Sequence, residues 1–143
     1  MSREPFLRRI FPCTVATLGQ VESWFRGLLT EKGVDEGTAG DILYCLNEAL
    51  LNALDHGSQF RSDREVVVEY RFEPDRVTLI LTDAGGRAFD PAYFRDLAVR
   101  KDWGAGGRGI LIMQELMDEV GFFFVPGHST SVMLVKALGA AGA

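Results

Sequence analysis

Two segments in the first half of the chain repeat their hydrophobic residues at helical spacing. Residues 21–29 predict one helix, and Gly33 is expected to end it because glycine tolerates the left-handed backbone of a helix stop. The second helix is predicted to begin at a capping residue, Asp35 or Thr38, and to end near Gly57. Its core-facing stripe consists of Ile42, Leu46, Ala49, Leu50 and Ala53.

Strand patterns flank and follow these helices. Residues 6–18 are mainly apolar and β-branched, and Pro12 among them predicts a strand at the edge of a sheet. Residues 65–72 and 76–82 are predicted to pair as a hairpin around the turn at residues 73–75.

The second half of the chain predicts a further helix and a second hairpin. Residues 92–99 are expected to form a short helix, and a longer helix is expected to follow Gly109 and to stop at Gly121. Residues 122–125 and 130–137 are predicted to be the last two strands. One face of the longer helix carries Ile110, Met113, Met117 and Val120.

This order of elements predicts an α+β fold: a two-layer sandwich with helices packed on one face of a mixed, mostly antiparallel sheet. The 143 residues are expected to form a single domain, residues 1–143, with an ordered core over residues 6–137. The small residues at 139–143 are expected to fray.

Composition narrows the classes of function. A net charge of −5 argues against a general nucleic-acid binder, which needs a basic face. The chain has no apolar run long enough for a membrane span and no apolar signal core in residues 1–10, so we expect a cytoplasmic protein. Cys13 and Cys45 are far apart in the sequence and are expected to be buried, reduced thiols.

Glu48 and Asn52 are four residues apart, so they share one face of the second helix about 6 Å apart along its axis. A carboxylate can orient a hydroxyl, and a carboxamide oxygen can ligate a divalent cation. The alternative is the solvated face of an amphipathic helix. Because Tyr44, Cys45 and Leu51 flank these polar residues, we favour the wall of a covered pocket.

Two glycine-containing segments add candidate ligand contacts. Gly104 to Gly109 feed a helix N-terminus and include Arg108, which suits a phosphate site, although a flexible connector explains the glycines equally well. Asp83, followed by Gly85 and Gly86, can accept a hydrogen bond from an exocyclic amine such as that of adenine. A carboxylate that caps a turn is the alternative.

Together these segments resemble a known family. Residues 47–57, NEALLNALDHG, resemble the N box of the GHKL (Bergerat-fold) ATPases and are similar to the NEAxxNAxxHG pattern of their anti-sigma-factor serine kinase branch. Asp83-Ala84-Gly85 resembles the adenine-binding box of that family, and residues 89–91 match its usual FDP. Residues 106–110 and 116–120 resemble its second glycine box and the LMDEV run. Residues 130–136 resemble its closing strand.

The resemblance implies a role for each candidate residue. Glu48 would be the general base toward a substrate hydroxyl, and Asn52 would bind Mg²⁺ on the phosphates of ATP. Asp83 would receive the adenine amine, with Gly85 or Gly86 giving room and Thr130 assisting through water. The phosphates would be cradled by Gly107, Arg108 and Gly109.

The resemblance also implies partners. Such proteins form homodimers, bind a sigma factor or an equivalent target, and phosphorylate a serine on a small STAS-domain antagonist. No direct contact with nucleic acid or membrane is expected. The rival hypothesis is a Bergerat-fold binding module that uses ATP only to shape an interface and transfers no phosphate.

Overall fold

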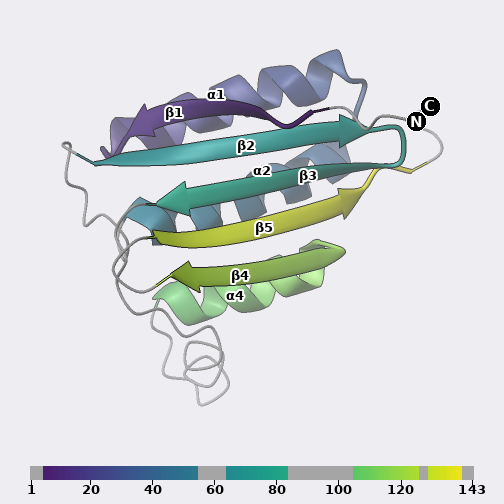
Figure 1. Cartoon of the computed structure of the whole chain (residues 1–143). Helices are drawn as coiled ribbons and strands as arrows, with labels where there is room; N and C mark the ends of the chain where they lie inside the picture. The colour runs from purple at the N-terminus through teal and green to yellow at the C-terminus, as the bar shows by residue number, and fades with distance from the viewer. Residues whose placement is uncertain (1–4, 55–63, 84–104, 126–128, 140–143) are drawn as a thin grey trace.

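The helices of this protein lie together on one face of an antiparallel sheet (Figure 1). The computed structural model describes residues 5–54, 64–83, 105–125 and 129–139. Helices α1, α2 and α4 form one layer, and five strands form the other. The predicted two-layer α+β architecture is confirmed.

The sheet has the strand order β1-β2-β3-β5-β4. Its strands are β1 (Leu7–Pro12), β2 (Glu65–Glu73), β3 (Arg76–Asp83), β4 (Glu119–Val125) and β5 (Ser129–Ala137). The pairings between these strands are all antiparallel, so the described strands contain none of the parallel pairs that a mixed sheet would add. Strand β1 lies at an edge, as Pro12 predicts.

The helices are α1 (Ala16–Glu31), α2 (Glu36–Asn52) and α4 (Ala105–Leu116). Gly33 follows α1 with φ of 72°, which confirms the predicted helix stop. Asp35 is the N-cap of α2, and its carboxylate accepts a hydrogen bond from the backbone N–H of Thr38 at 3.0 Å. All five residues of the predicted core-facing stripe of α2 are buried. None of the helices in the described ranges is both long and apolar enough to cross a membrane.

The first predicted strand is wrong in length. Strand β1 ends at Pro12, and residues 16–18 belong to helix α1. The hydroxyl of Thr17 is buried and donates to the carbonyl oxygen of Pro12. The side chain of this β-branched residue therefore ties the first turn of the helix to the end of the strand, although its residue type favours a strand.

The predicted boundaries of the later helix are also wrong. Helix α4 begins at Ala105, ahead of Gly109, and ends at Leu116. Val120 and Gly121 lie in strand β4, where Val120 pairs with Leu134 of β5. The apolar spacing of Val120 fits a helix, but strand pairing in the sheet decides the outcome. The predicted short helix at residues 92–99 lies outside the described residues.

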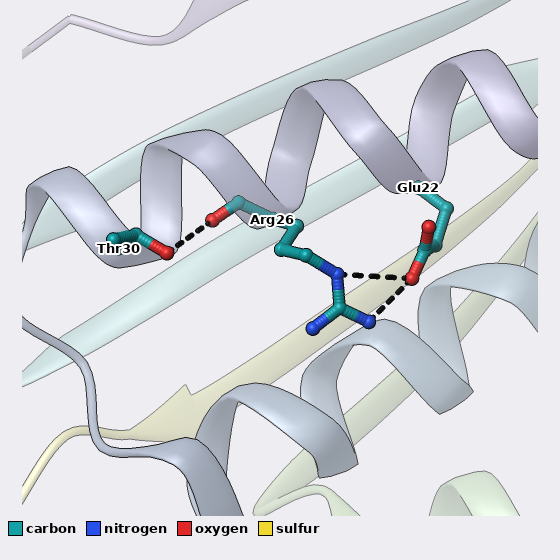
Figure 2. Close-up of polar contacts among 3 residues, drawn as sticks. All are labelled: Glu22, Arg26 and Thr30. Carbon is teal, nitrogen blue, oxygen red and sulfur yellow. Dashed lines mark hydrogen bonds and ion pairs between the residues drawn. The ribbon is translucent and has the colours of Figure 1, made fainter.

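The outward side of α1 is polar. Figure 2 shows Glu22 paired with Arg26 one turn later, while the hydroxyl of Thr30 donates to the carbonyl oxygen of Arg26 at 3.0 Å. Both partners of the ion pair are well exposed to solvent. The inward side of the same helix buries Val21, Phe25 and Leu29, so the predicted amphipathic helix is confirmed.

Candidate functional site

Four element ends meet at one end of the molecule. The C-terminal end of α2, the end of β3 and the starts of β5 and α4 all lie on the left in Figure 1, away from the chain termini. This arrangement brings together segments that are far apart in sequence. It collects Asn52, Asp83, Thr130 and the glycine-containing start of α4 at that end.

Asp83 and Thr130 face each other across the centre of the sheet. They are paired residues on β3 and β5, and their exposed fractions are 3% and 8%. The next pair on this helix-facing side, Leu81 and Val132, is apolar and buried. The row of core residues therefore ends in a carboxylate and a hydroxyl. The carboxylate can accept a hydrogen bond from a polar ligand, and the hydroxyl can donate one to the same ligand.

Asn52 is the last residue of α2 and is 9% exposed. Within the described part of the chain, its amide nitrogen is buried and has no hydrogen-bond partner. Leaving such a donor unsatisfied costs about 1–3 kcal/mol. A partner such as a phosphate oxygen would satisfy it, and the amide oxygen would remain free to ligate a cation.

Glu48 lies one turn before Asn52 and is half-buried. Burial raises the pKa of its carboxyl group above the ordinary value. A raised pKa makes the carboxylate a better proton acceptor than a fully solvated glutamate. Half-burial of Glu48 fits the wall of a pocket better than a fully solvated helix face, and the choice between these two alternatives stays a prediction.

Cys45 lies beside this pair on α2 and is fully buried. Burial, together with the nearby carboxylates of Asp41 and Glu48 and against the opposing charge of Lys136, raises the pKa of its thiol to about 12. The thiolate is thus disfavoured, and we expect the sulfur to be unreactive. The predicted burial of both cysteines is confirmed, and both are free thiols.

Gly107, Arg108 and Gly109 lie in the first turns of α4 rather than in a loop. Helix α4 therefore presents its N-terminus here, where the N–H groups of its first turn and the helix dipole favour an anion. The structure describes only the backbone of these residues. Gly85 and Gly86 lie outside the described residues, so their predicted contributions stay predictions.

The polar groups at this end suit a cation that a bound ligand also helps to coordinate. Among the described residues, no three His, Cys, Asp or Glu side chains gather as a metal site. Asn52 offers one amide oxygen, and Mg²⁺ commonly takes one or two protein ligands together with substrate phosphates and water. The unsatisfied amide of Asn52 is therefore compatible with a magnesium–nucleotide ligand.

Lys136 is a structural residue that the hydrophobic pattern missed. Its amine donates to the carbonyl oxygen of Leu116 at 2.6 Å and lies 3.8 Å from the carboxylate of Asp41. It thereby joins β5, the end of α4 and helix α2. Lys136 is the charged residue in the otherwise uncharged strand β5, and that contrast could have identified it from the sequence.

Comparison with known families defines the class of this protein. The family model of the histidine kinase-like ATPase domain matches residues 11–136. This match covers most of the chain and all of the elements described above, apart from part of β1 and the last residue of β5. The chain belongs to the histidine kinase-like ATPase family.

The relatives place the chain more closely, in the anti-sigma-factor serine kinase branch of the GHKL ATPases. An anti-sigma F factor from Pasteuria penetrans is 32% identical over 101 residues, which cover 68% of this chain and 67% of the relative. An anti-sigma F factor from Clostridium beijerinckii is 28% identical over 102 residues, covering 67% and 68%. The serine-protein kinase RsbW of Listeria monocytogenes is 26% identical over 117 residues, covering 77% and 73%.

A solved structure shares the fold. The crystal structure of the RsbU and RsbW domains of a Mycobacterium tuberculosis protein matches with a TM-score of 0.68 at 21% identity. The match covers 94% of this chain but only 32% of that one, so this chain spans about a third of the length of the larger structure. The likeness supports the α+β sandwich and its strand order.

Proposed function

We propose that this protein is an ATP-dependent serine protein kinase that binds Mg²⁺ and ATP and phosphorylates a small STAS-domain protein. The observation that carries the proposal is the end of α2. There the buried amide of Asn52, which has no hydrogen-bond partner within the described ranges, lies one turn after the half-buried carboxylate of Glu48. Phosphoryl transfer needs little more than a positioned hydroxyl, a cation and neutralised charge.

The nucleotide would lie across the end of the sheet. The carboxylate of Asp83 accepts a hydrogen bond from the exocyclic amine of adenine. Thr130, its paired residue on β5, supports that contact through water. Gly85 or Gly86 leaves room for the base, and the phosphates rest against Gly107, Arg108 and Gly109. These roles follow the family pattern, and the burial of Asp83 and Thr130 supports them, because a dry site strengthens each hydrogen bond.

In the proposed reaction, the serine oxygen of the substrate forms a bond to the γ-phosphorus of ATP. The bond from that phosphorus to the β–γ bridging oxygen breaks, and ADP leaves. Glu48 accepts the proton of the serine hydroxyl. Asn52 holds Mg²⁺, which supplies charge neutralisation on the phosphates when it is bound.

We propose partner switching in the cytoplasm as the biological setting. The names of the relatives, anti-sigma F factor and serine-protein kinase, support a sigma factor or an equivalent regulator as the protein that is held and released. Phosphorylation of the STAS-domain antagonist would then decide which partner the kinase binds. No direct contact with nucleic acid or a membrane is part of this proposal.

We further propose that the protein is a homodimer. The sheet face opposite the helices carries exposed Phe123 and Val125, two residues apart on the edge strand β4, and large apolar side chains exposed on such a face favour association. Sedimentation of the wild type and of Phe123→Glu tests this proposal. We expect a dimer that the substitution dissociates, and a monomeric wild type would contradict the proposal.

The test of the kinase uses radiolabelled ATP and the single-domain STAS proteins of the source organism. We expect the wild type to transfer the γ-phosphate to a serine of one of them. Glu48→Gln should lower the transfer rate about 10²–10⁴-fold while ATP binding is kept, because a general base contributes that much. If the wild type binds ATP but labels none of these proteins, the non-catalytic binding module is the better account. If Glu48→Gln transfers normally, Glu48 is not the base.

A further inference from the structure

An exposed aromatic side chain borders the proposed base. Tyr44 lies one turn before Glu48 on α2, and Leu51 follows Glu48 by three residues, so all three share one side of the helix. Cys45, next to Tyr44 in sequence, is fully buried, whereas Tyr44 is 46% exposed. The sequence predicts that Tyr44 lines the wall of a covered pocket. The described residues of this chain leave the side chain of Tyr44 exposed, so they do not cover it.

We propose that Tyr44 is a docking residue for the protein substrate, and that it contacts the surface of the STAS domain around the acceptor serine. This inference rests on the proposed kinase function. It assigns to Tyr44 a part in substrate recognition and no part in nucleotide binding or in the chemical step.

Geometry makes contact at Tyr44 unavoidable for a folded substrate. The general base must come within about 2.6–3.2 Å of the serine hydroxyl. Tyr44 is only four residues from Glu48, about 6 Å along the helix axis. A standard interface covers about 800 Å² on each partner, which is a disc of about 16 Å radius. A substrate domain centred on Glu48 therefore covers Tyr44 as well.

The chemistry of Tyr44 suits such an interface. Tyrosine combines a large apolar ring with a polar hydroxyl, and it is enriched among the residues that dominate binding energy. In the described part of α1, α2 and α4, Tyr44 is the large apolar side chain that remains exposed; the other exposed ones lie on the strands or ahead of α1. Helix α2 thus leaves one aromatic ring open next to the proposed base.

The charges around Tyr44 define the partner further. Asp41 precedes it by three residues and Glu48 follows by four, so the ring lies between two carboxylates of the same helix. Lys136 lies 3.8 Å from Asp41 and partly neutralises it, whereas Glu48 has no cation paired with it in the described part of the chain. We infer a substrate surface that is apolar opposite Tyr44 and neutral or basic beside the serine, because an acidic surface would be repelled.

The experiment measures steady-state phosphorylation of the labelled STAS protein by wild type, Tyr44→Ala and Tyr44→Phe. We expect Tyr44→Ala to raise KM for the STAS protein about 30-fold, the effect of losing one strong interface residue. In Tyr44→Ala, kcat at saturating substrate and KM for ATP should stay within about twofold of the wild type. The ATP-dependent rise in Tm should stay within the same limits. Tyr44→Phe should restore most of the affinity, because it keeps the ring.

Leu7→Ala is the matched control, because Leu7 is similarly exposed but lies on β1, and its KM should not change. An unchanged KM in Tyr44→Ala, with active wild type, overturns the docking role and leaves the kinase intact. A raised KM for ATP, or a lost rise in Tm, would assign Tyr44 to the nucleotide side and also overturn it. A wild type that labels no STAS protein removes both the kinase and this inference.

Discussion

The layer between the helices and the sheet is filled by aromatic rings toward the β2–β3 turn, whereas at the opposite end it holds buried polar groups. The ring of Phe25 is fully buried and stacks on Phe72, with centroids 5.9 Å apart and planes at 14°. The neighbouring rings are Trp24 and Tyr70. At the other end, the same layer buries Asn52, Asp83 and Thr130.

The two ends serve different purposes. Aromatic rings that meet edge to face or stacked bury a large apolar area and stabilise the fold. Buried polar groups cost free energy unless they are satisfied, and the amide nitrogen of Asn52 has no hydrogen-bond partner among the residues that the structure describes. A natural protein that keeps such a group gains something other than stability from it, and ligand binding is the gain that we propose. The following substitutions test this contrast between a stabilising end and a functional end.

Phe25→Ala should have the largest effect on stability. Removing a fully buried ring leaves a cavity among Trp24, Tyr70 and Phe72, so we expect the free energy of unfolding to fall by about 3–5 kcal/mol. Urea unfolding followed by circular dichroism measures it. Tyr44→Ala is the control with an exposed ring, and it should cost about 0.5 kcal/mol or less. Equal losses for the two variants would contradict the contrast.

Asn52→Leu should act in the opposite direction. The substitution removes the unsatisfied amide and keeps a similar volume, so without nucleotide the free energy of unfolding should rise by about 1–3 kcal/mol. The same urea experiment measures it, and Asn47→Leu, at an exposed position on the same helix, should change stability little. A strongly destabilised Asn52→Leu would mean that the amide is satisfied within the fold.

Glu48→Gln should stabilise the protein by a smaller amount that depends on pH. Because the pKa of Glu48 is raised in the folded state, folding favours its protonated form, and wild-type stability declines as pH rises through that pKa. Glutamine removes this decline. The difference in Tm between variant and wild type should therefore be smallest below about pH 4, where glutamate is protonated in both states, and larger at neutral pH. A difference that grows toward acid would contradict the raised pKa.

Glu22→Ala should have the smallest effect. It breaks the ion pair with Arg26 on the outward side of α1, where both partners are exposed (Figure 2). Such pairs one helical turn apart contribute about 0.3–0.5 kcal/mol. Thermal unfolding at low and high salt measures the effect, and the difference from the wild type should shrink as salt rises. A salt-independent loss above about 1 kcal/mol would indicate a structural role for Glu22.

The hydrophobic pattern predicted most elements, because helical and strand periods are local properties of the sequence. It failed where strand pairing overrides the local pattern. Val120 has helical spacing, but it lies in a strand and pairs with Leu134 of β5. That Glu48 and Asn52 share one helix face was predictable because they are four residues apart on one helix. The opposition of Asp83 and Thr130 was not, because it depends on the register between two strands that are separated by 45 residues of chain.

The most direct test of the central claim is thermal unfolding of the wild type and Asn52→Ala with ATP, with and without Mg²⁺. A ligand that binds only the folded state stabilises it by about 2.7 kcal/mol at a hundredfold excess over its Kd. We predict a Mg²⁺-dependent rise in Tm for the wild type that Asn52→Ala loses. GTP should give a smaller rise, because guanine has no exocyclic amine at the position that Asp83 is proposed to contact. An unchanged Tm of the wild type at millimolar ATP would contradict the account.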